Sequence, residues 1–180
     1  GYLHLGQART FWIAQERARA AGGTLLYRNE NLDSDRCKPE YTEAAMEDCR
    51  WIGLNWKGDV VHQSERLDLY RKAFEQLKQS GYLFPCTCTR RDLENAVAAP
   101  HGEGGETIYP GTCREQTTPP EADCNWRFRV PDGEHVTFED AHYGPQQFVA
   151  GRDFGDFPVW QKNGMPSYQL AVVVDDAAQE

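Results

Sequence analysis

The chain has 180 residues, 39% of them hydrophobic and 12% aromatic, so it can bury a core and does not belong with the disordered proteins. It holds no apolar run of about 18 residues, which argues against a membrane-spanning helix. Its net charge of -9 argues against a protein that coats nucleic acid by charge alone, and without a charged and apolar leader we expect it in the cytoplasm.

The first expected helix spans residues 6–20, where apolar side chains are spaced to share one face. Gly22 and Gly23 suit its end. A short strand over residues 24–28 is expected to follow. The apolar face of the helix is expected to lie in the core.

Two more helices are expected in the first half. Pro39 suits a first helical position and Gly53 suits the end of that helix. Ser64 can cap a third helix that ends at Gly81. Their apolar stripes predict core packing rather than a binding site.

The character of the sequence changes after residue 85, where cysteines appear. Thr89 and Asp92 are expected to open a short helical segment, followed by a glycine-rich loop over residues 100–105. We interpret residues 86–125 as a small inserted module.

Strands are expected in the last third of the chain. Apolar residues alternate with polar ones over 126–130 and 136–138, which predicts half-buried antiparallel strands. Asn163–Gly164 is a two-residue hairpin signal. The apolar run 170–174 after it is interpreted as a strand at the edge of a sheet.

This order of elements predicts an α/β fold with an embedded second module. We expect residues 1–85 to form the first part of a core and residues 86–125 to form the insert. Residues 126–180 would supply strands of the insert and the return to the core.

A histidine and glycines precede the first expected helix. A helix start offers free backbone N–H groups and a partial positive charge, so it can hold an anion. Gly6 would let a ligand approach the backbone, and His4 can donate to a phosphate or ribose oxygen. The alternative is a histidine that only caps or packs the helix.

Three of the six cysteines are spaced like metal ligands (the six are Cys37, Cys49, Cys86, Cys88, Cys113 and Cys124). Cys86 and Cys88 in extended backbone point to the same side, and Cys113 can close a third corner of a tetrahedron. Soft thiolate ligands select zinc. Cys124, His101 or a water can fill the fourth corner, and free cysteines without metal are the alternative.

The run of residues 1–10 resembles the signature that class I aminoacyl-tRNA synthetases write as HIGH, in the variant of the glutamyl enzymes. The resemblance implies that His4 and Gly6 lie against ATP. There they help neutralise charge while an amino-acid carboxylate attacks the α-phosphate. Gln7 stands where the signature ends in histidine, a position at which the glutamyl enzymes vary.

Two further segments resemble the same family. Residues 27–33 resemble its Arg-x-Glu-Asp-x-Asp segment, which implies that Glu30 contacts the ammonium group of bound glutamate, although Asn31 replaces the usual Asp. Residues 166–176 resemble the strand that lines the glutamate pocket, which implies that Tyr168 offers its hydroxyl to the substrate. A solvated loop of charges and a core tyrosine are the alternatives.

The resemblance is closest to the glutamyl-Q-tRNA(Asp) branch of the glutamyl-tRNA synthetase family. In that branch a tyrosine four residues before the last cysteine is the fourth zinc ligand, which implies that Tyr109 joins Cys86, Cys88 and Cys113. The implied fold is a Rossmann-type class I catalytic core with a zinc-bearing insert that resembles the acceptor-stem-binding piece.

The implied activity is that of an ATP-dependent ligase, with magnesium accompanying ATP. It would activate L-glutamate and transfer it to queuosine of tRNA(Asp). An ordinary glutamyl-tRNA synthetase that charges tRNA(Glu) and a non-catalytic zinc-containing remnant are the alternatives. The family's upstream strand, its Val-x-Arg-Gly-Ala-Asp segment and its lysine loop find no match in residues 1–180, so we expect a chain cut at both ends and inactive alone.

Overall fold

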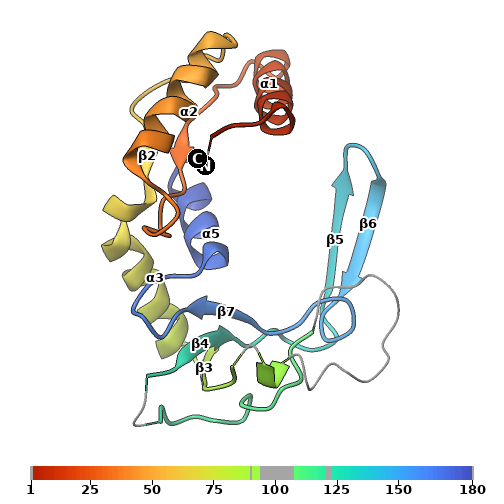
Figure 1. The fold of residues 1–180 in the computed structure, drawn as a ribbon. Coiled ribbons are helices and arrows are strands. Elements are labelled where there is room, and N and C mark those ends of the chain that lie inside the picture. Colours follow the sequence, from red (N-terminus) through yellow and green to blue (C-terminus); the bar gives the residue numbers. More distant parts are fainter. Residues whose placement is uncertain (1, 90, 94–107, 121–122, 180) are drawn as a thin grey trace. The chain divides into compact units, whose positions relative to one another are not determined.

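The computed structural model describes residues 2–89, 91–93, 108–120 and 123–179 (Figure 1). The chain divides into two compact units, Gly1–Leu67 and Asp68–Glu180. Helices and strands alternate as far as residue 86, strands lie between residues 125 and 160, and a helix comes last, which confirms the expected α/β class. Within the described ranges no helix is long and apolar enough to cross a membrane. The predicted boundaries at residues 85 and 125 stay a prediction.

The first unit contains two helices, α1 (Leu5–Ala20) and α2 (Pro39–Trp51), close to their predicted ranges. Pro39 is the first residue of α2, as expected. Gly22 and Gly53 follow the two helices with left-handed φ values of +66° and +83°. A residue without Cβ adopts this conformation without strain, so both glycines end their helices as predicted.

The expected burial of the apolar face of α1 is wrong. Phe11 and Trp12 are 36% and 44% exposed, and the one buried residue of this helix is Gln15. The side-chain amide of Gln15 donates to the carbonyl of Gly53 (3.2 Å) and accepts the N–H of Asn55 (2.7 Å). The polar side chain is buried because it satisfies the backbone that leaves α2.

The strands β1 (Arg28–Asn29) and β2 (Val61–His62) pair in parallel, and α2 lies between them in the chain. This β1–α2–β2 order is the crossover unit of α/β sheets. The expected strand over residues 24–28 overlaps β1 only at Arg28. The carbonyls of residues 25 and 27 nevertheless accept backbone N–H groups from residues 57 and 61.

The prediction that Ser64 caps the third helix is wrong. Helix α3 (Leu67–Gln79) begins after a 3-10 turn, η1 (Gln63–Glu65), that contains Ser64. The Ser64 hydroxyl accepts from the side-chain amide of Asn31 (2.9 Å), and the Ser64 N–H donates back to that amide (3.0 Å). Ser64 therefore bonds to the loop after β1 instead of capping α3.

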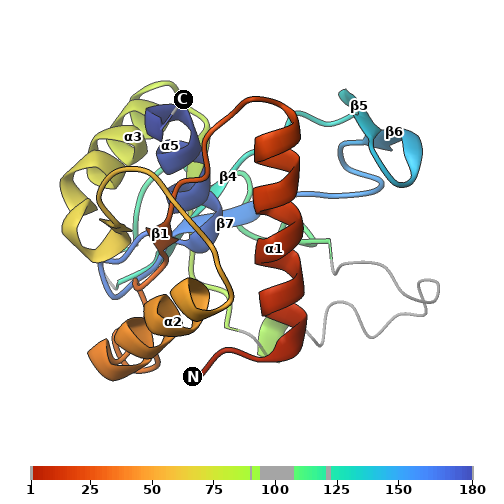
Figure 2. The same cartoon turned by 90° about the horizontal axis from the view of Figure 1, so that it is seen from above.

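In the second unit, α3 and α5 (Tyr168–Gln179) lie side by side in both views (Figures 1 and 2). The Tyr70 hydroxyl and the Asp175 carboxylate join them by a hydrogen bond of 2.8 Å, and both residues are fully buried. This bond links segments that are far apart in the sequence.

Helix α5 overturns the predicted strand over residues 170–174. Leu170, Ala171 and Asp175 are buried while Val173 is 67% exposed, a helical spacing of the buried positions. Ser167 precedes the helix, and its hydroxyl accepts the N–H of Leu170 (3.4 Å). The N-terminal cap and the packing of one face outweigh the strand preference of three consecutive valines.

The second unit also contains an antiparallel sheet in the order β3–β4–β7, with β3 at Leu83–Cys86, β4 at Asn125–Phe128 and β7 at Phe157–Trp160. The strand expected from residue 126 onward is thereby confirmed. The turn at Asn163–Gly164 also forms. Its second arm is a single bridge from Trp160 to Pro166, because α5 starts directly afterward.

A separate two-stranded ribbon joins β5 (His135–Asp140) to β6 (Gly144–Val149). The strand is where the sequence predicted it, but its expected half-burial is wrong. Val136 and Phe138 are 44% and 50% exposed, and Phe138 stacks on Phe148 with ring centroids 5.9 Å apart. Among the described strands β5 pairs with β6 alone, so the Phe138 and Phe148 rings cover one another instead of a core.

Candidate metal centre and substrate-binding residues

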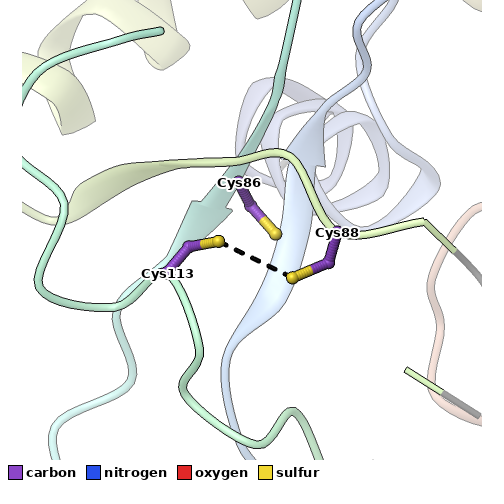
Figure 3. A group of neighbouring side chains, drawn as sticks. All are labelled: Cys86, Cys88 and Cys113. Carbon is purple, nitrogen blue, oxygen red and sulfur yellow. Dashed lines mark hydrogen bonds between the residues drawn. The ribbon is translucent and has the colours of Figure 1, made fainter. Parts of the chain in front are cut away.

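Three thiols meet at the end of β3 (Figure 3). Cys86 is the last residue of this strand, Cys88 follows two residues later, and Cys113 comes from a separate segment. Their sulfur atoms lie within 4.8 Å of one another, and the Sγ atoms of Cys88 and Cys113 are 3.6 Å apart. Cys86 and Cys113 are buried and Cys88 is half-buried. The structure thus brings together the three cysteines that the sequence singled out.

The hydroxyl of Tyr109 lies against the same group. It is 3.4 Å from Cys86 Sγ and 3.6 Å from Cys88 Sγ, and it accepts the backbone N–H of Cys113 at 2.8 Å. Tyr109 is 8% exposed. Its hydroxyl therefore occupies a fourth corner beside the sulfur atoms.

The spacing of these four atoms fits a zinc ion. Zinc lies about 2.3 Å from thiolate sulfur and about 2.0 Å from oxygen, so a tetrahedral site has sulfurs about 3.8 Å apart and sulfur-to-oxygen distances of about 3.5 Å. The Cys88–Cys113 distance of 3.6 Å and the two Tyr109 distances of 3.4 and 3.6 Å agree with these values. Three soft sulfur donors favour zinc over magnesium or calcium.

Two other side chains were candidates for the fourth corner, those of Cys124 and His101. The Sγ of Cys124 is not among the described ligand atoms that lie within 4.8 Å of one another. Cys124 precedes Asn125, which lies directly opposite Cys86 in the β3–β4 register. The Cys124 thiol interacts with the backbone and the thiol of Cys86, so it lies next to the group without being one of its members. His101 lies outside the described residues.

A tight turn brings Cys113 back to Tyr109. Gly111 has a φ of +81°, and nothing lies within 4 Å of a Cβ built there. The glycine is needed for its backbone conformation rather than for space, and Pro110 before it suits the preceding turn position. The N–H of Arg114 donates to the carbonyl of Gly111 at 2.9 Å, which closes a second turn over residues 111–114.

The polar side chains perturb one another's protonation. Burial raises the pKa of the Cys88 thiol to about 11. Burial also acts to raise the pKa of Cys113, but hydrogen bonds with Tyr109 and neighbouring groups outweigh it and lower that pKa to about 7. Burial raises the pKa of the Tyr109 phenol well above its usual range. A metal ion that binds here must displace protons.

Sequence reasoning missed a buried arginine beside the thiols. Arg127, on β4, is 8% exposed, and its Nε–H donates to Cys86 Sγ at 3.3 Å. Its guanidinium lies 4.1 Å from the centroid of the Tyr109 ring. In the sequence Arg127 looks like the solvent side of an alternating strand, and only the pairing of β3 with β4 shows that it faces the cysteines.

The predicted nucleotide-binding residues stand at the start of α1. The backbone N–H of His4 donates to the side chain of Gln7 at 3.1 Å. A Cβ at Gly6 would lie 3.3 Å from two atoms of the His4 ring. The first turn of α1 contains no acidic residue. The first turn therefore places no carboxylate of its own at the positive end of the helix, which suits an anionic ligand.

The predicted ammonium contact, Glu30, follows β1. Arg28 donates to Glu30 Oε1 from Nε (3.3 Å) and from Nη2 (3.1 Å). The Glu30 side chain is 36% exposed. Asn31, which differs from the family pattern, ties the same loop to Ser64 by two hydrogen bonds. Hydrogen bonds of Arg28 and Asn31, which lie on either side of Glu30 in the chain, thereby hold this loop in place.

Tyr168 is the first residue of α5 and is 61% exposed. The alternative of a core tyrosine therefore does not hold. His4, Gly6 and Glu30 belong to the first unit and Tyr168 to the second. Their joint action on one substrate stays a prediction.

Comparisons with known proteins agree on one family. The whole chain, residues 1–180, matches the family model for class I tRNA synthetases (E and Q), catalytic domain. The chain is 45% identical to the glutamyl-Q tRNA(Asp) synthetase of Symbiobacterium thermophilum and 42% identical to that of Rhodopirellula baltica. Each match covers 98% of the chain but only 59% and 58% of the relative.

A solved structure shares the fold. It is a glutamate tRNA ligase from Elizabethkingia meningosepticum in complex with its amino acid, and it superposes with a TM-score of 0.80 at 25% sequence identity. The match covers 99% of this chain and 40% of the ligase. The matches to these three proteins thus cover almost every residue of this chain but only part of each relative.

Proposed function

The chain belongs to the class I tRNA synthetases for glutamate and glutamine, a family of ligases, and from this membership we propose that it is the catalytic part of a glutamyl-Q-tRNA(Asp) synthetase. The observation that carries the proposal is the 45% identity, over 98% of the chain, to an enzyme of that name. In this proposal the protein activates L-glutamate with ATP and magnesium. It then transfers the glutamyl group to queuosine of tRNA(Asp), in the cytoplasm.

The start of α1 is the proposed ATP site. The first-turn N–H groups and the side chain of His4 donate to phosphate oxygens, and Gly6 leaves the backbone accessible. The chemistry needs no covalent intermediate on the protein: the glutamate carboxylate attacks the α-phosphate and pyrophosphate leaves. The protein contributes orientation and charge neutralisation.

The proposed glutamate contacts are Glu30 and Tyr168. A carboxylate is a fitting partner for the substrate ammonium group, and the two Arg28 contacts to Oε1 hold it in place. The hydroxyl of the exposed Tyr168 can donate to or accept from the substrate. Support for both roles is the resemblance of their segments to the family pattern.

We further propose that Cys86, Cys88, Tyr109 and Cys113 hold one zinc ion. Bound zinc would act structurally, as a cross-link between the end of β3 and the 109–113 turn, and would leave no ligand position open for a reacting water. The interatomic distances given above support this set of ligands.

Metal analysis tests the zinc site. Protein purified without chelator and freshly reduced should carry about one zinc per chain. Cys113→Ser should lower the ratio strongly, whereas Cys124→Ser should leave it unchanged because that thiol lies outside the group. A ratio near zero in the unaltered protein would remove the zinc proposal and leave the synthetase proposal standing.

Labelled glutamate tests the reaction. The complete protein is incubated with ATP and three RNAs: tRNA(Asp) with queuosine, tRNA(Asp) without it, and tRNA(Glu). We expect label on the first alone. Label on tRNA(Glu) instead would identify an ordinary glutamate tRNA ligase, the class of the solved structure. No label on any RNA, together with no glutamate-dependent pyrophosphate exchange, would favour the non-catalytic remnant.

A further inference from the structure

The buried arginine Arg127 contacts two of the four proposed zinc ligands. Its Nε–H donates to Cys86 Sγ at 3.3 Å, and its guanidinium carbon lies 4.1 Å from the centre of the Tyr109 ring. Its Nη1 donates to the backbone carbonyl of Asp156 at 3.2 Å. One planar group therefore reaches a sulfur, an aromatic face and the backbone next to β7 at the same time.

No carboxylate of the described residues is paired with the positive charge of Arg127. The nearby Asp156 carboxylate is engaged elsewhere: it accepts the N–H of Val130 at 2.9 Å and lies 3.5 Å from Nε of Arg114. A buried charge without a partner is costly, so an anionic group is expected beside this arginine.

The proposed zinc centre supplies that anion. Three thiolates around one divalent ion leave a net negative charge, and ionisation of the tyrosine would add another. Arg114, which follows Cys113 in the chain, cannot balance this charge because both oxygens of Asp132 bind its Nη1 at 2.9 Å. Arg127, by contrast, contacts two of the proposed ligands and forms no ion pair with any carboxylate that the structure describes.

We infer that Arg127 is the positioning residue of the metal centre: it balances the charge of the zinc–thiolate group and holds the Tyr109 ring so that its hydroxyl faces the ion. This inference rests on the proposed zinc site. The N–H···S bond draws electron density from the Cys86 sulfur, and the cation over the ring face fixes the orientation of the phenol. Loss of such contacts around a metal typically weakens binding by about 10–100-fold.

Two substitutions of Arg127 and one matched control test the inference. Arg127→Met keeps much of the side-chain length but removes the charge and the donors. Arg127→Lys keeps the charge but not the planar group. Arg129→Met makes the same change on the same face of the chain, where the arginine lies over the Phe84 ring at 5.1 Å and has no described contact with a cysteine.

The zinc dissociation constant, measured at one pH by competition with a chromophoric chelator, should rise about 10–100-fold in Arg127→Met and about threefold or more in Arg127→Lys. It should stay within about twofold of the unaltered protein in Arg129→Met. In the cobalt-substituted proteins, the sulfur-to-cobalt charge-transfer band should move to lower energy in Arg127→Met, because the Cys86 sulfur loses its hydrogen bond. A merely structural role would not move this band.

Unaltered affinity and an unaltered band in a folded Arg127→Met protein would overturn the inference while leaving the zinc site in place. If that variant does not fold, as judged by circular dichroism, Arg127→Lys decides: zinc affinity and a cobalt band equal to those of the unaltered protein would overturn it. An unaltered protein that binds neither zinc nor cobalt overturns the zinc proposal and this inference together, and labelling of tRNA(Asp) still tests the synthetase proposal.

Discussion

A Cβ added at Gly6 would stand 3.3 Å from both Cε1 and Nδ1 of His4, tighter than side chains normally pack. Gly6 lies inside α1 without a left-handed φ, so alanine should favour the helix by about 1 kcal/mol while displacing the imidazole. We therefore expect Gly6→Ala to leave the free energy of unfolding equal or higher and to slow glutamate-dependent pyrophosphate exchange by the complete enzyme.

Gly23→Ala is the matched control for this substitution. Its Cβ would meet only the carbonyl oxygen of Ala18 at an ordinary 3.5 Å, far in the sequence from His4. Urea unfolding and exchange kinetics should be measured on both variants. Equal exchange rates for Gly6→Ala and the unaltered enzyme would show that the histidine ring does not need this space.

Asp153 should make part of the stability dependent on pH. Hydrogen bonds from Arg152 and from the N–H of Val149 lower the pKa of its carboxyl from 3.8 to about 2. A carboxyl whose pKa is depressed by folding stabilises the protein above its unfolded value, and that contribution is lost as the pH falls through the folded value. The free-energy difference between the unaltered protein and Asp153→Asn should therefore shrink as the pH falls from about 5 toward about 2.

Urea unfolding at several pH values measures this difference, and a carboxyl titration by NMR measures the pKa itself. Asp35→Asn, which also removes an exposed carboxyl, is measured beside it as the matched control. A normal titration of Asp153 near pH 4 would contradict the prediction.

The sequence singled out the three clustered cysteines but not the arginine beside them. Cys86, Cys88 and Cys113 stand out by type and spacing, and the tyrosine follows from the family pattern. The role of Arg127 can be inferred only from the pairing of β3 with β4. The register places Arg127 opposite Phe84, and its side chain is thereby directed toward the cysteines. A contact made across strands leaves no spacing signal in the chain.

At the scale of elements, the hydrogen bond between Tyr70 and Asp175 joins α3 to α5 inside the second unit. Tyr70→Phe keeps the ring and removes the hydroxyl that serves a buried carboxylate, so we expect it to lower the free energy of unfolding by about 1–3 kcal/mol. Asp175→Asn and the double variant complete a cycle, measured by urea unfolding. A coupling energy near zero would show that the two helices do not depend on this bond.

The helix boundaries marked by glycine or proline were the most predictable features, because these two residues act locally, whereas the serine at position 64 misplaced a helix start. Pro39 and Gly53 bound α2 as the sequence suggested, and Gly22 ends α1. The run at 170–174 was predicted as a strand because three valines favour one, whereas the cap residue Ser167 and the burial of one face favour the helix. Short apolar runs cannot be assigned by pattern alone.

At the scale of the whole molecule, the resemblance of motifs spread along almost the entire chain predicts the family, and the match over residues 1–180 confirms it. Exposure was harder to predict. Phe11 and Phe138 have the spacing of buried side chains, yet both remain substantially exposed. Periodicity tells which residues share a face, but only the arrangement of elements tells whether anything covers that face.

The order β3–β4–β7 also bears on how fast the chain can fold. β3 must find β4 across about 40 residues, and closing a loop of that length opposes the first contact between the strands. An ion held by Cys86 and Cys113 would shorten the remaining loop to about 12 residues, which lowers the closure free energy by about 1 kcal/mol.

Refolding of this sheet should then run several-fold faster with zinc than with chelator. Trp126 and Trp160 lie in this sheet, so stopped-flow fluorescence can follow its assembly. Equal refolding rates with zinc and with chelator would mean that β3 and β4 pair before the ion binds. The metal would then stabilise a strand pair that has already formed.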